Sequence, residues 1–344
     1  MVLSYYLYSY PYKLLWIVAD KIRKTKEVAF YCADPLDYEM FLPISKFLPN
    51  IKIIAKNKKT IEYLRKKNIQ YAKMPSFPNV VIMARHMPYK FPVKKIIKIG
   101  FDHGLYQFKR WTAANNYNDF NIYFVSSDDQ VETAKKLGIK TTKAIGYPKL
   151  DNAFNGLYDE KYLSDIKIKC KIDESKKTIL FTSTWDVAGL SAIDKWVNNL
   201  DQLSAEYNIL VTVHTWAKLK YKDYLRQNDK ITFIGEHNTT PYLMISDLLI
   251  GDYSSIIGEF CAFDKPIITF KVPESERTIP EIIKLIKNIS LQISSFDELT
   301  SAIKECIKDP DEKSEERKKA NKLLFYKLDG EAGKRAALEI QNFF

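Results

Sequence analysis

The stretch from residue 247 to 270 has the residue types and spacing of an anion-binding site. An apolar run at 248–250 leads into a polar turn that contains Asp252, Ser254 and Ser255, and a helical pattern follows. The first amide N–H groups of a helix lack partners within it and carry partial positive charge, so they attract phosphate. The two serine hydroxyls would add donors. The same residues also form ordinary turns and helix caps, so the pattern leaves both interpretations open.

His103 has the chemistry of a general base. It follows the apolar run 96–101 closely and stands between Asp102 and Gly104. A neutral imidazole at a strand end can accept a proton from an attacking hydroxyl, and Asp102 or another carboxylate could orient the ring. Glycine beside it permits a tight turn or the close approach of a substrate. A purely structural histidine is the alternative.

Four further polar residues stand where they could complete a site. Thr184 follows an apolar run at its carboxyl end, and so does His214. Glu259 lies one helical turn beyond the serines, where it would either face the same side or point to solvent. Arg335 stands near the C-terminus and is either a phosphate ligand, a task suited to its forked donors, or a surface charge on a helix.

The elements that must position these residues alternate between short apolar runs and helical patterns. Strands are expected at 28–31, 51–55, 80–84, 96–101 and 122–125, and again at 178–182, 209–213, 231–234, 248–250, 267–270 and 290–293. Helices are expected at 60–67, 130–137, 192–203, 274–286 and 299–307. Strands separated by helices indicate parallel βαβ units. Ligands of such sheets collect at the carboxyl ends of the strands. The sequence therefore predicts an α/β protein with two Rossmann-like doubly wound domains facing across a cleft, which is the glycosyltransferase-B plan.

The order of the motifs resembles that of the CDP-glycerol glycerophosphotransferases, the TagB/TagF-like enzymes that build teichoic acids and related polyol-phosphate polymers. The resemblance rests on the 247–270 stretch, His103-Gly104, Gly-Tyr-Pro-Lys-Leu-Asp at 146–151, Thr184-Trp185 and Asp-Gly-Glu-Ala-Gly-Lys-Arg at 329–335. Each motif is short, and their shared order carries the weight. The chain departs from the family in two places. Leu105 follows the His-Gly pair where the family usually continues with Thr-Pro-Leu-Lys, and Thr215 follows His214 where family members tend to have a proline.

The resemblance implies transfer of glycerol phosphate from CDP-glycerol to a hydroxyl of a glycan or of a lipid-linked cell-surface polymer, with release of CMP. The catalytic residues would be His103 and Asp102, and the donor-binding residues would be His214, Asp252, Ser254, Ser255, Glu259, Arg335 and Thr184. Alternatives are transfer of ribitol phosphate from CDP-ribitol, a nucleotide-sugar glycosyltransferase or epimerase of the same fold, and a non-catalytic scaffold. The acceptor and the oligomeric state stay open.

The domain boundary is expected between residues 149 and 177, and we place it after 155. Residues 1–155 would form the N-terminal acceptor-side domain, beginning with a basic amphipathic segment. Residues 156–344 would form the C-terminal nucleotide-donor domain, whose last helix can cross back to the N-terminal domain. The N-terminal 150 residues hold 26 Lys and Arg against 11 Asp and Glu, although the whole chain has a net charge of only +11.

The basic half indicates an anionic partner. Tyrosines and apolar residues in 5–18 precede a basic stretch at 21–26, a pattern typical of a helix lying in a membrane interface. No apolar run is long enough to span a membrane, and the four distant cysteines fit a reducing cytosol. We therefore expect a cytoplasmic protein, peripheral on the inner face of the cell membrane, that binds an anionic membrane surface and not nucleic acid.

Metal and cofactor motifs are not apparent. The only Asp-x-Asp, at 309–311, lies in a charged loop, and the sequence has neither a Walker motif nor a Gly-x-Gly-x-x-Gly turn. The sequence thus predicts a metal-independent transferase without a cofactor.

Overall fold

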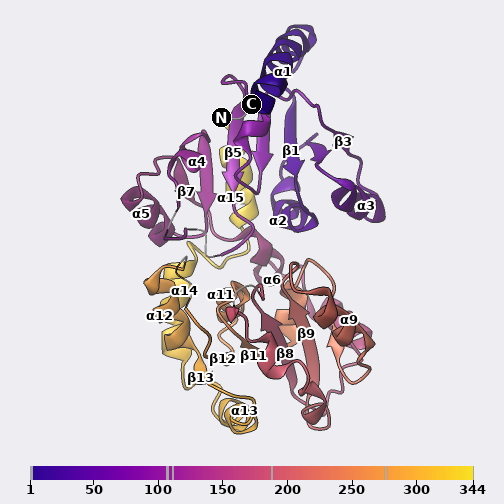
Figure 1. Ribbon diagram of the computed structural model, residues 1–344, viewed down its shortest axis with the longest axis vertical. Helices are drawn as coiled ribbons and strands as arrows, with labels where there is room; N and C mark the ends of the chain where they lie inside the picture. Colours follow the sequence, from indigo (N-terminus) through magenta and orange to yellow (C-terminus); the bar gives the residue numbers. More distant parts are fainter. Residues whose placement is uncertain are drawn as a thin grey trace. The chain divides into compact units, whose positions relative to one another are not determined.

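The structure, a computed structural model, describes residues 3–105, 108–110, 112–186, 189–274, 276 and 278–343. The described chain forms two compact units. Unit 1 comprises residues 1–103, 112–151 and 329–344, and unit 2 comprises residues 104–111 and 152–328. The C-terminal helix therefore belongs to the same unit as the N-terminal helix, and Figure 1 shows it, in yellow, beside the magenta strands of unit 1.

Unit 1 contains a seven-stranded parallel sheet in the order β3-β2-β1-β4-β5-β6-β7. Its strands are β1 Val28–Cys32, β2 Lys52–Ala55, β3 Ala72–Lys73, β4 Val80–Met83, β5 Ile97–Phe101, β6 Ile122–Val125 and β7 Thr142–Ala144. Its helices are α1 Leu3–Ile22, α2 Pro35–Ser45, α3 Lys58–Lys66, α4 Asn115–Asn118, α5 Asp128–Lys136 and α15 Ala332–Gln341, with 3-10 turns η1 Pro88–Lys90 and η2 Pro148–Leu150.

Unit 2 contains a six-stranded parallel sheet in the order β10-β9-β8-β11-β12-β13. Its strands are β8 Thr178–Ser183, β9 Asn208–Val213, β10 Thr232–Phe233, β11 Leu248–Gly251, β12 Ile267–Phe270 and β13 Leu291–Ile293. Its helices are α7 Glu160–Lys169, α8 Ile193–Trp196, α9 Leu219–Gln227, α10 Thr240–Ile245, α11 Ile256–Cys261, α12 Pro280–Ile289, α13 Leu299–Lys308 and α14 Ser314–Leu324, with the 3-10 turn η4 Leu200–Gln202. Helix α6 Asp151–Phe154 begins where unit 1 gives way to unit 2.

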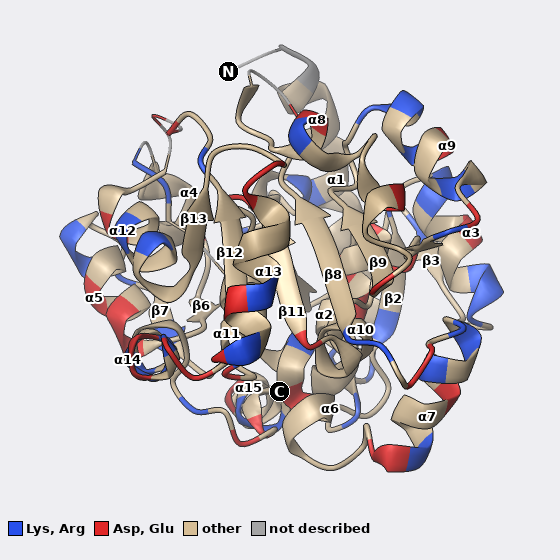
Figure 2. Cartoon of the chain, turned by 90° about the horizontal axis from the view of Figure 1, so that it is seen from below, with Lys and Arg blue, Asp and Glu red and all other residues tan. Residues whose placement is uncertain are grey.

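Both sheets have the doubly wound Rossmann strand order, in which the winding reverses beside the first strand. The predicted α/β class with two such sheets is confirmed. The central strands β1, β4, β8 and β11 are buried and nearly all apolar, because helices cover both faces of a parallel sheet. Figure 2 shows the same separation: β8, β11 and β12 are tan, and Lys, Arg, Asp and Glu lie on the surrounding helices and loops.

Stacked aromatic rings fix the centre of unit 1. The rings of Phe30 on β1 and Phe41 on α2 stack with centroids 4.0 Å apart, and Phe101 on β5 packs against Phe30. Burying each phenyl ring stabilises the fold by roughly 2 to 3 kcal/mol. The same packing brings the start of α2 to the carboxyl end of the sheet.

The C-terminal helix is held to unit 1 by a buried carboxylate. Asp151 accepts hydrogen bonds from the N–H groups of Ala332, at 3.1 Å, and Gly333, at 2.6 Å. A Cβ atom at Gly333 would lie 2.6 Å from the carbonyl oxygen of Pro43 on α2, so only glycine allows this approach. Two of the sequence motifs, 146–151 and 329–335, thus bind each other.

Two helix predictions need correction. The helix expected at 192–203 is broken into α8 and η4, because Asn199 departs from helical geometry with φ −115°. The helix expected at 274–286 starts only at Pro280, which takes the first helical position, where proline is favoured. Among the described residues, no helix is long and apolar enough to cross a membrane.

Candidate functional site

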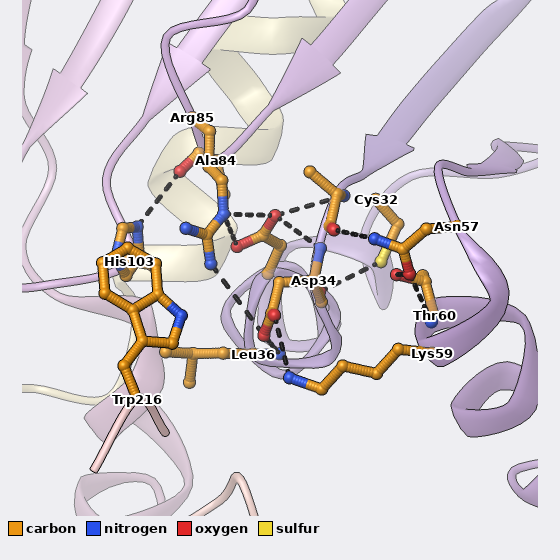
Figure 3. Close-up of polar contacts among 12 residues, drawn as sticks. Cys32, Asp34, Leu36, Asn57, Lys59, Thr60, Ala84, Arg85, His103 and Trp216 are labelled. Carbon is orange, nitrogen blue, oxygen red and sulfur yellow. Dashed lines mark hydrogen bonds and ion pairs between the residues drawn. The ribbon is translucent and has the colours of Figure 1, made fainter. Parts of the chain in front are cut away.

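The polar residues of unit 1 gather where β1, β4 and β5 end. Asp34, Arg85 and His103 each follow one of these strands within two residues. The reversal of winding in this sheet lies between β1 and β4, and a doubly wound sheet binds its ligands beside that point. Figure 3 shows these side chains directed toward one another.

The side chain of His103 is oriented through Nδ1. Asp102 Oδ1 lies 3.1 Å from Nδ1 and also accepts the backbone N–H of His103 at 2.7 Å. The carbonyl oxygen of Ala84 lies 3.4 Å from the same nitrogen (Figure 3). Both neighbours are acceptors, so the proton of the neutral ring belongs on Nδ1. Nε2 then carries the lone pair that a general base needs.

The electrostatics of the pair support this arrangement. Burial lowers the pKa of His103, but the hydrogen bond and charge of Asp102 outweigh burial and raise that pKa above its usual value. Burial raises the pKa of Asp102, but the hydrogen bond and charge of His103 outweigh it and bring the pKa below its usual value. Asp102 is therefore ionised at neutral pH, and its charge would stabilise an imidazolium at His103.

A charged network beside His103 was not predicted. Arg85 Nε donates to both carboxylate oxygens of Asp37, at 2.8 and 3.0 Å. Asp37 is fully buried and also accepts the N–H groups of Ala33 and Asp34. Burial alone would lower the pKa of Arg85, but the charge and hydrogen bonds of Asp37 outweigh burial and raise that pKa above its usual value. The guanidinium therefore stays charged. Lys59 Nζ lies 3.0 Å from Asp34 Oδ2 (Figure 3).

The sequence held one cue to this network. In the run Cys-Ala-Asp-Pro-Leu-Asp at 32–37, the N-cap residue Asp34 and the N3 residue Asp37 form a capping box. Pro35 takes the first helical position, where proline is favoured. Arg85 gave no such cue. His86 beside it packs against Tyr117, and its Nε2 lies 2.9 Å from the hydroxyl of Tyr123.

Asp252 follows β11 directly and, at the carboxyl end of the sheet of unit 2, connects two loops by hydrogen bonds. It is fully buried and accepts the N–H groups of Thr184, at 2.8 Å, and Ala192, at 2.9 Å. Burial raises its pKa to about 7, against the opposing effect of these hydrogen bonds. Gly251 before it has no room for a side chain, since a Cβ atom would lie 2.7 Å from Thr182. Asp252 thus fixes the loops that follow β8 and β11, and it lies beneath the surface.

Ser254 and Ser255 lead into α11 as predicted. The carbonyl of Ser254 accepts the N–H of Ile257 at 3.1 Å, and Ser255 is the N-cap residue. The hydroxyl of Ser255 makes no capping hydrogen bond. Glu259 is buried, which rules out the solvent-facing alternative.

An aromatic cluster stands at the carboxyl ends of β8 and β9. The rings of Trp185 and Trp216 meet edge to face with centroids 5.1 Å apart. The ring centroids of His214 and Trp216 lie 5.5 Å apart, and Nδ1 of His214 accepts the backbone N–H of Trp216 at 3.1 Å. Trp185 is 37% exposed and Trp216 60% exposed, so both rings can contact a ligand from solvent.

Arg335, expected to be a donor ligand, is hydrogen-bonded to protein acceptors. Its Nε donates to the carbonyl of Ile145 at 2.8 Å, and its two terminal nitrogens donate to the two carboxylate oxygens of Asp329 at 2.8 and 3.0 Å. The forked donors expected to bind phosphate are thus directed at protein acceptors within unit 1. The geometry favours a structural role that fixes the start of α15.

In the part of the chain that the structure describes, no three His, Cys, Asp or Glu side chains are grouped closely enough to hold a metal ion.

Two doubly wound sheets, each with polar residues beside the reversal of winding, define the glycosyltransferase-B class of fold. Solved structures share it. A complex of the wall teichoic acid polymerase TagF with CDPG superposes with a TM-score of 0.74 at 17% identity, over 96% of this chain and 92% of that one. The Staphylococcus aureus MnaA–UDP structure gives 0.64 at 15% identity, over 93% and 97% of the two chains.

The chain belongs to the CDP-glycerol:poly(glycerophosphate) glycerophosphotransferase family, whose sequence profile matches residues 12–342. The teichoic acid poly(glycerol phosphate) polymerase of Bacillus spizizenii is 30% identical over 151 residues, which is 40% of this chain and 36% of the relative. The teichoic acid glycerol-phosphate transferase of Staphylococcus aureus is 24% identical over 229 residues, 62% of this chain and 55% of the relative. The matched part is thus well under two thirds of the length of these relatives.

Proposed function

We propose that this chain transfers glycerol phosphate from CDP-glycerol to a hydroxyl of a glycan or of a lipid-linked cell-surface polymer, and releases CMP. The observation that carries the proposal is the Asp102–His103 pair, in which both neighbours of Nδ1 are acceptors and Nε2 is left to act as base. Family membership supplies the reaction class.

In the proposed reaction, Nε2 of His103 removes the proton of the acceptor hydroxyl as its oxygen attacks the β-phosphorus of CDP-glycerol. A new phosphorus–oxygen bond forms, the bond to the CMP oxygen breaks, and CMP leaves with the electron pair. Asp102 stabilises the imidazolium. Arg85 lies close to this pair, and we assign it the role of holding α2 and the following loop in place through Asp37.

Unit 2 would bind the donor. Ser254 and Ser255 would donate hydrogen bonds to the diphosphate, where negative charge rises as CMP departs. Asp252 and the Thr184 N–H hold their loops in the required shape. The exposed Trp216 would stack on the cytosine ring, a use to which exposed aromatic faces are suited, with His214 beside it. Glu259 stays a candidate for the ribose hydroxyls.

One other donor is favoured by a specific finding. The ribitol-phosphate polymerase TarK of Staphylococcus aureus is 25% identical over 166 residues, 45% of this chain and 32% of that protein. CDP-ribitol carries the same cytidine and diphosphate, so the residues named above would bind it equally. The polyol end would decide between the two donors.

We also propose that the protein lies on the inner face of the cell membrane. Two hydrogen bonds anchor helix α1. The Tyr12 hydroxyl donates to the carbonyl oxygen of Ser76 at 2.6 Å, and Trp16 Nε1 donates to the carbonyl oxygen of Pro78 at 2.8 Å. Its other side exposes an apolar stripe, composed of Leu7, Tyr10, Leu14, Ile17, Val18 and Ile22. An apolar stripe beside basic residues is suited to an anionic membrane surface, where a lipid-linked acceptor would be found.

The test measures CMP release from CDP-glycerol and from CDP-ribitol, with UDP-GlcNAc as the nucleotide-sugar comparison. We expect CMP release with a membrane or polymer acceptor, and its loss in His103→Ala while CDP-glycerol still raises the melting temperature. Release of UDP, or unchanged turnover in His103→Ala, would refute the proposal. Donor binding without turnover in the wild type would favour a non-catalytic scaffold.

A further inference from the structure

A pocket opens in unit 1 at the opposite end of the sheet from His103. Its volume is about 570 Å³, and it lies between α1 and the segment 88–98. Lys98 on its wall is the second residue of β5, and Asp119 comes shortly before β6, so the pocket lies where these strands begin. His103 follows the other end of β5. The pocket is therefore separate from the candidate catalytic site.

The walls of the pocket are apolar and largely aromatic. Trp16 and Ile17 of α1 line one side, and Tyr89, Phe91 and Val93 line the other. The Tyr8 hydroxyl donates to the carbonyl of Lys90 at 2.8 Å and ties α1 to this segment. Ile17 also belongs to the exposed apolar stripe of α1, so the lining continues directly into that stripe.

Four lysines, Lys13, Lys94, Lys95 and Lys98, also line the pocket, against a single carboxylate, that of Asp119. Within the described residues, none of the four ammonium groups has a carboxylate within 4.0 Å. Lys98 Nζ has only a marginal contact, 3.5 Å from the carbonyl of Val93. Burial lowers the pKa of Lys98, and Asp119 offsets only part of that effect. Lys13, Lys94 and Lys95 are exposed and Lys98 is half-buried, so the four lysines give the pocket a positive rim that no nearby carboxylate in the described part of the chain offsets.

We propose that this pocket binds one anionic phospholipid, with the phosphate among Lys13, Lys94, Lys95 and Lys98 and the first part of the acyl chains against Trp16, Ile17 and Tyr89. A simple anion would leave the exposed Ile17 and Tyr89 in water, and an uncharged lipid would not use the positive charge of the four lysines, so an amphiphile that carries a phosphate fits both halves. The inference builds on the proposed membrane association and adds a defined headgroup site to it. It does not depend on the transferase activity.

The test titrates the purified protein with monomeric dihexanoyl phosphatidylglycerol, below the concentration at which it forms micelles, and follows binding by calorimetry. We expect dihexanoyl phosphatidylcholine and glycerol 3-phosphate to bind at least tenfold more weakly. The double variant Lys94→Gln/Lys95→Gln changes two exposed residues, so it should fold, and it should weaken binding at least tenfold. The matched control Lys24→Gln/Lys26→Gln removes the same charge outside the pocket and should change binding less than threefold.

Three results would overturn the site. The first is that the lipid monomer does not bind, and the second is that glycerol 3-phosphate binds equally well. The third is that the two double variants weaken binding equally, which would indicate diffuse attraction to the basic half. CMP release from CDP-glycerol with a soluble acceptor is measured on the same variants and should not change. Lipid binding without CMP release in the wild type would leave this site standing and refute the proposed transferase.

Discussion

Replacing Asp102 by Asn tests the proposed base directly. The carboxylate at 3.1 Å from Nδ1 is an acceptor, but an asparagine amide can turn its NH2 group toward the ring instead. Nδ1 would then accept that hydrogen bond, and the ring proton would move to Nε2. In that tautomer the ring cannot take a proton from the acceptor hydroxyl.

The magnitude follows from two losses. A hydrogen bond to a charged group contributes about 1.5 to 3 kcal/mol, so losing it as the imidazolium forms predicts a kcat roughly 10- to 150-fold lower. Loss of the negative charge also lowers the pKa of His103.

The assay is CMP release as a function of pH. In the wild type, activity should fall as pH drops through the raised pKa of His103, above 6.5, because the protonated ring cannot act as a base. In Asp102→Asn this acidic limb should move to lower pH while the plateau is lower. CDP-glycerol should still raise the melting temperature, and Asp129→Asn, an exposed aspartate in unit 1, serves as the matched control. An acidic limb at the same pH in both proteins, or an unchanged plateau, would refute the reasoning.

Three further predictions concern binding and stability. Trp216→Ala should weaken CDP-glycerol binding by about 1 to 3 kcal/mol if it stacks on the base, measured by calorimetry, and equal affinity would argue against stacking. Gly333→Ala should lower the free energy of unfolding by about 1 to 3 kcal/mol because its Cβ atom meets Pro43, whereas Gly235→Ala, with open space around it, should change it by less than about 0.5 kcal/mol in urea titrations. Burial raises the pKa of Asp151 to about 6, so the folded state holds that proton more tightly than the unfolded state. Stability should therefore increase by up to about 3 kcal/mol as pH falls from 7 to 4, and Asp151→Asn should show a correspondingly weaker dependence on pH.

The regular elements were predictable where apolar runs were long enough. Eleven expected strands lie in the two sheets, since a buried parallel strand must be apolar on both faces. The edge strands β3 and β7 escaped prediction because they are only two and three residues long and partly exposed. A run of that length does not differ in composition from a loop.

The site was predictable where its partners are adjacent in sequence. Asp102 and His103 are neighbours, and spacing alone indicated their pairing. Arg85 and Asp37 are 48 residues apart, and only the packing of β4 beside β1 brings them together. Arg335 illustrates the same limit: its residue type suited phosphate, but spacing could not reveal that its Nε donates to the carbonyl of Ile145, 190 residues away.

The joining of Asp151 to the N–H groups of Ala332 and Gly333 has a consequence for synthesis on the ribosome. The two sides of this contact are 181 and 182 residues apart, and most of unit 2 lies between them. Domains generally fold as units while the chain emerges, so unit 2 can be complete while unit 1 still lacks its last helix. Until α15 arrives, the surface of α2 around Pro43 is uncovered and the Asp151 carboxylate lacks both donors. A nascent chain stalled shortly before residue 329 would therefore present one finished unit and one unfinished unit, and the unfinished unit is the one a chaperone would recognise.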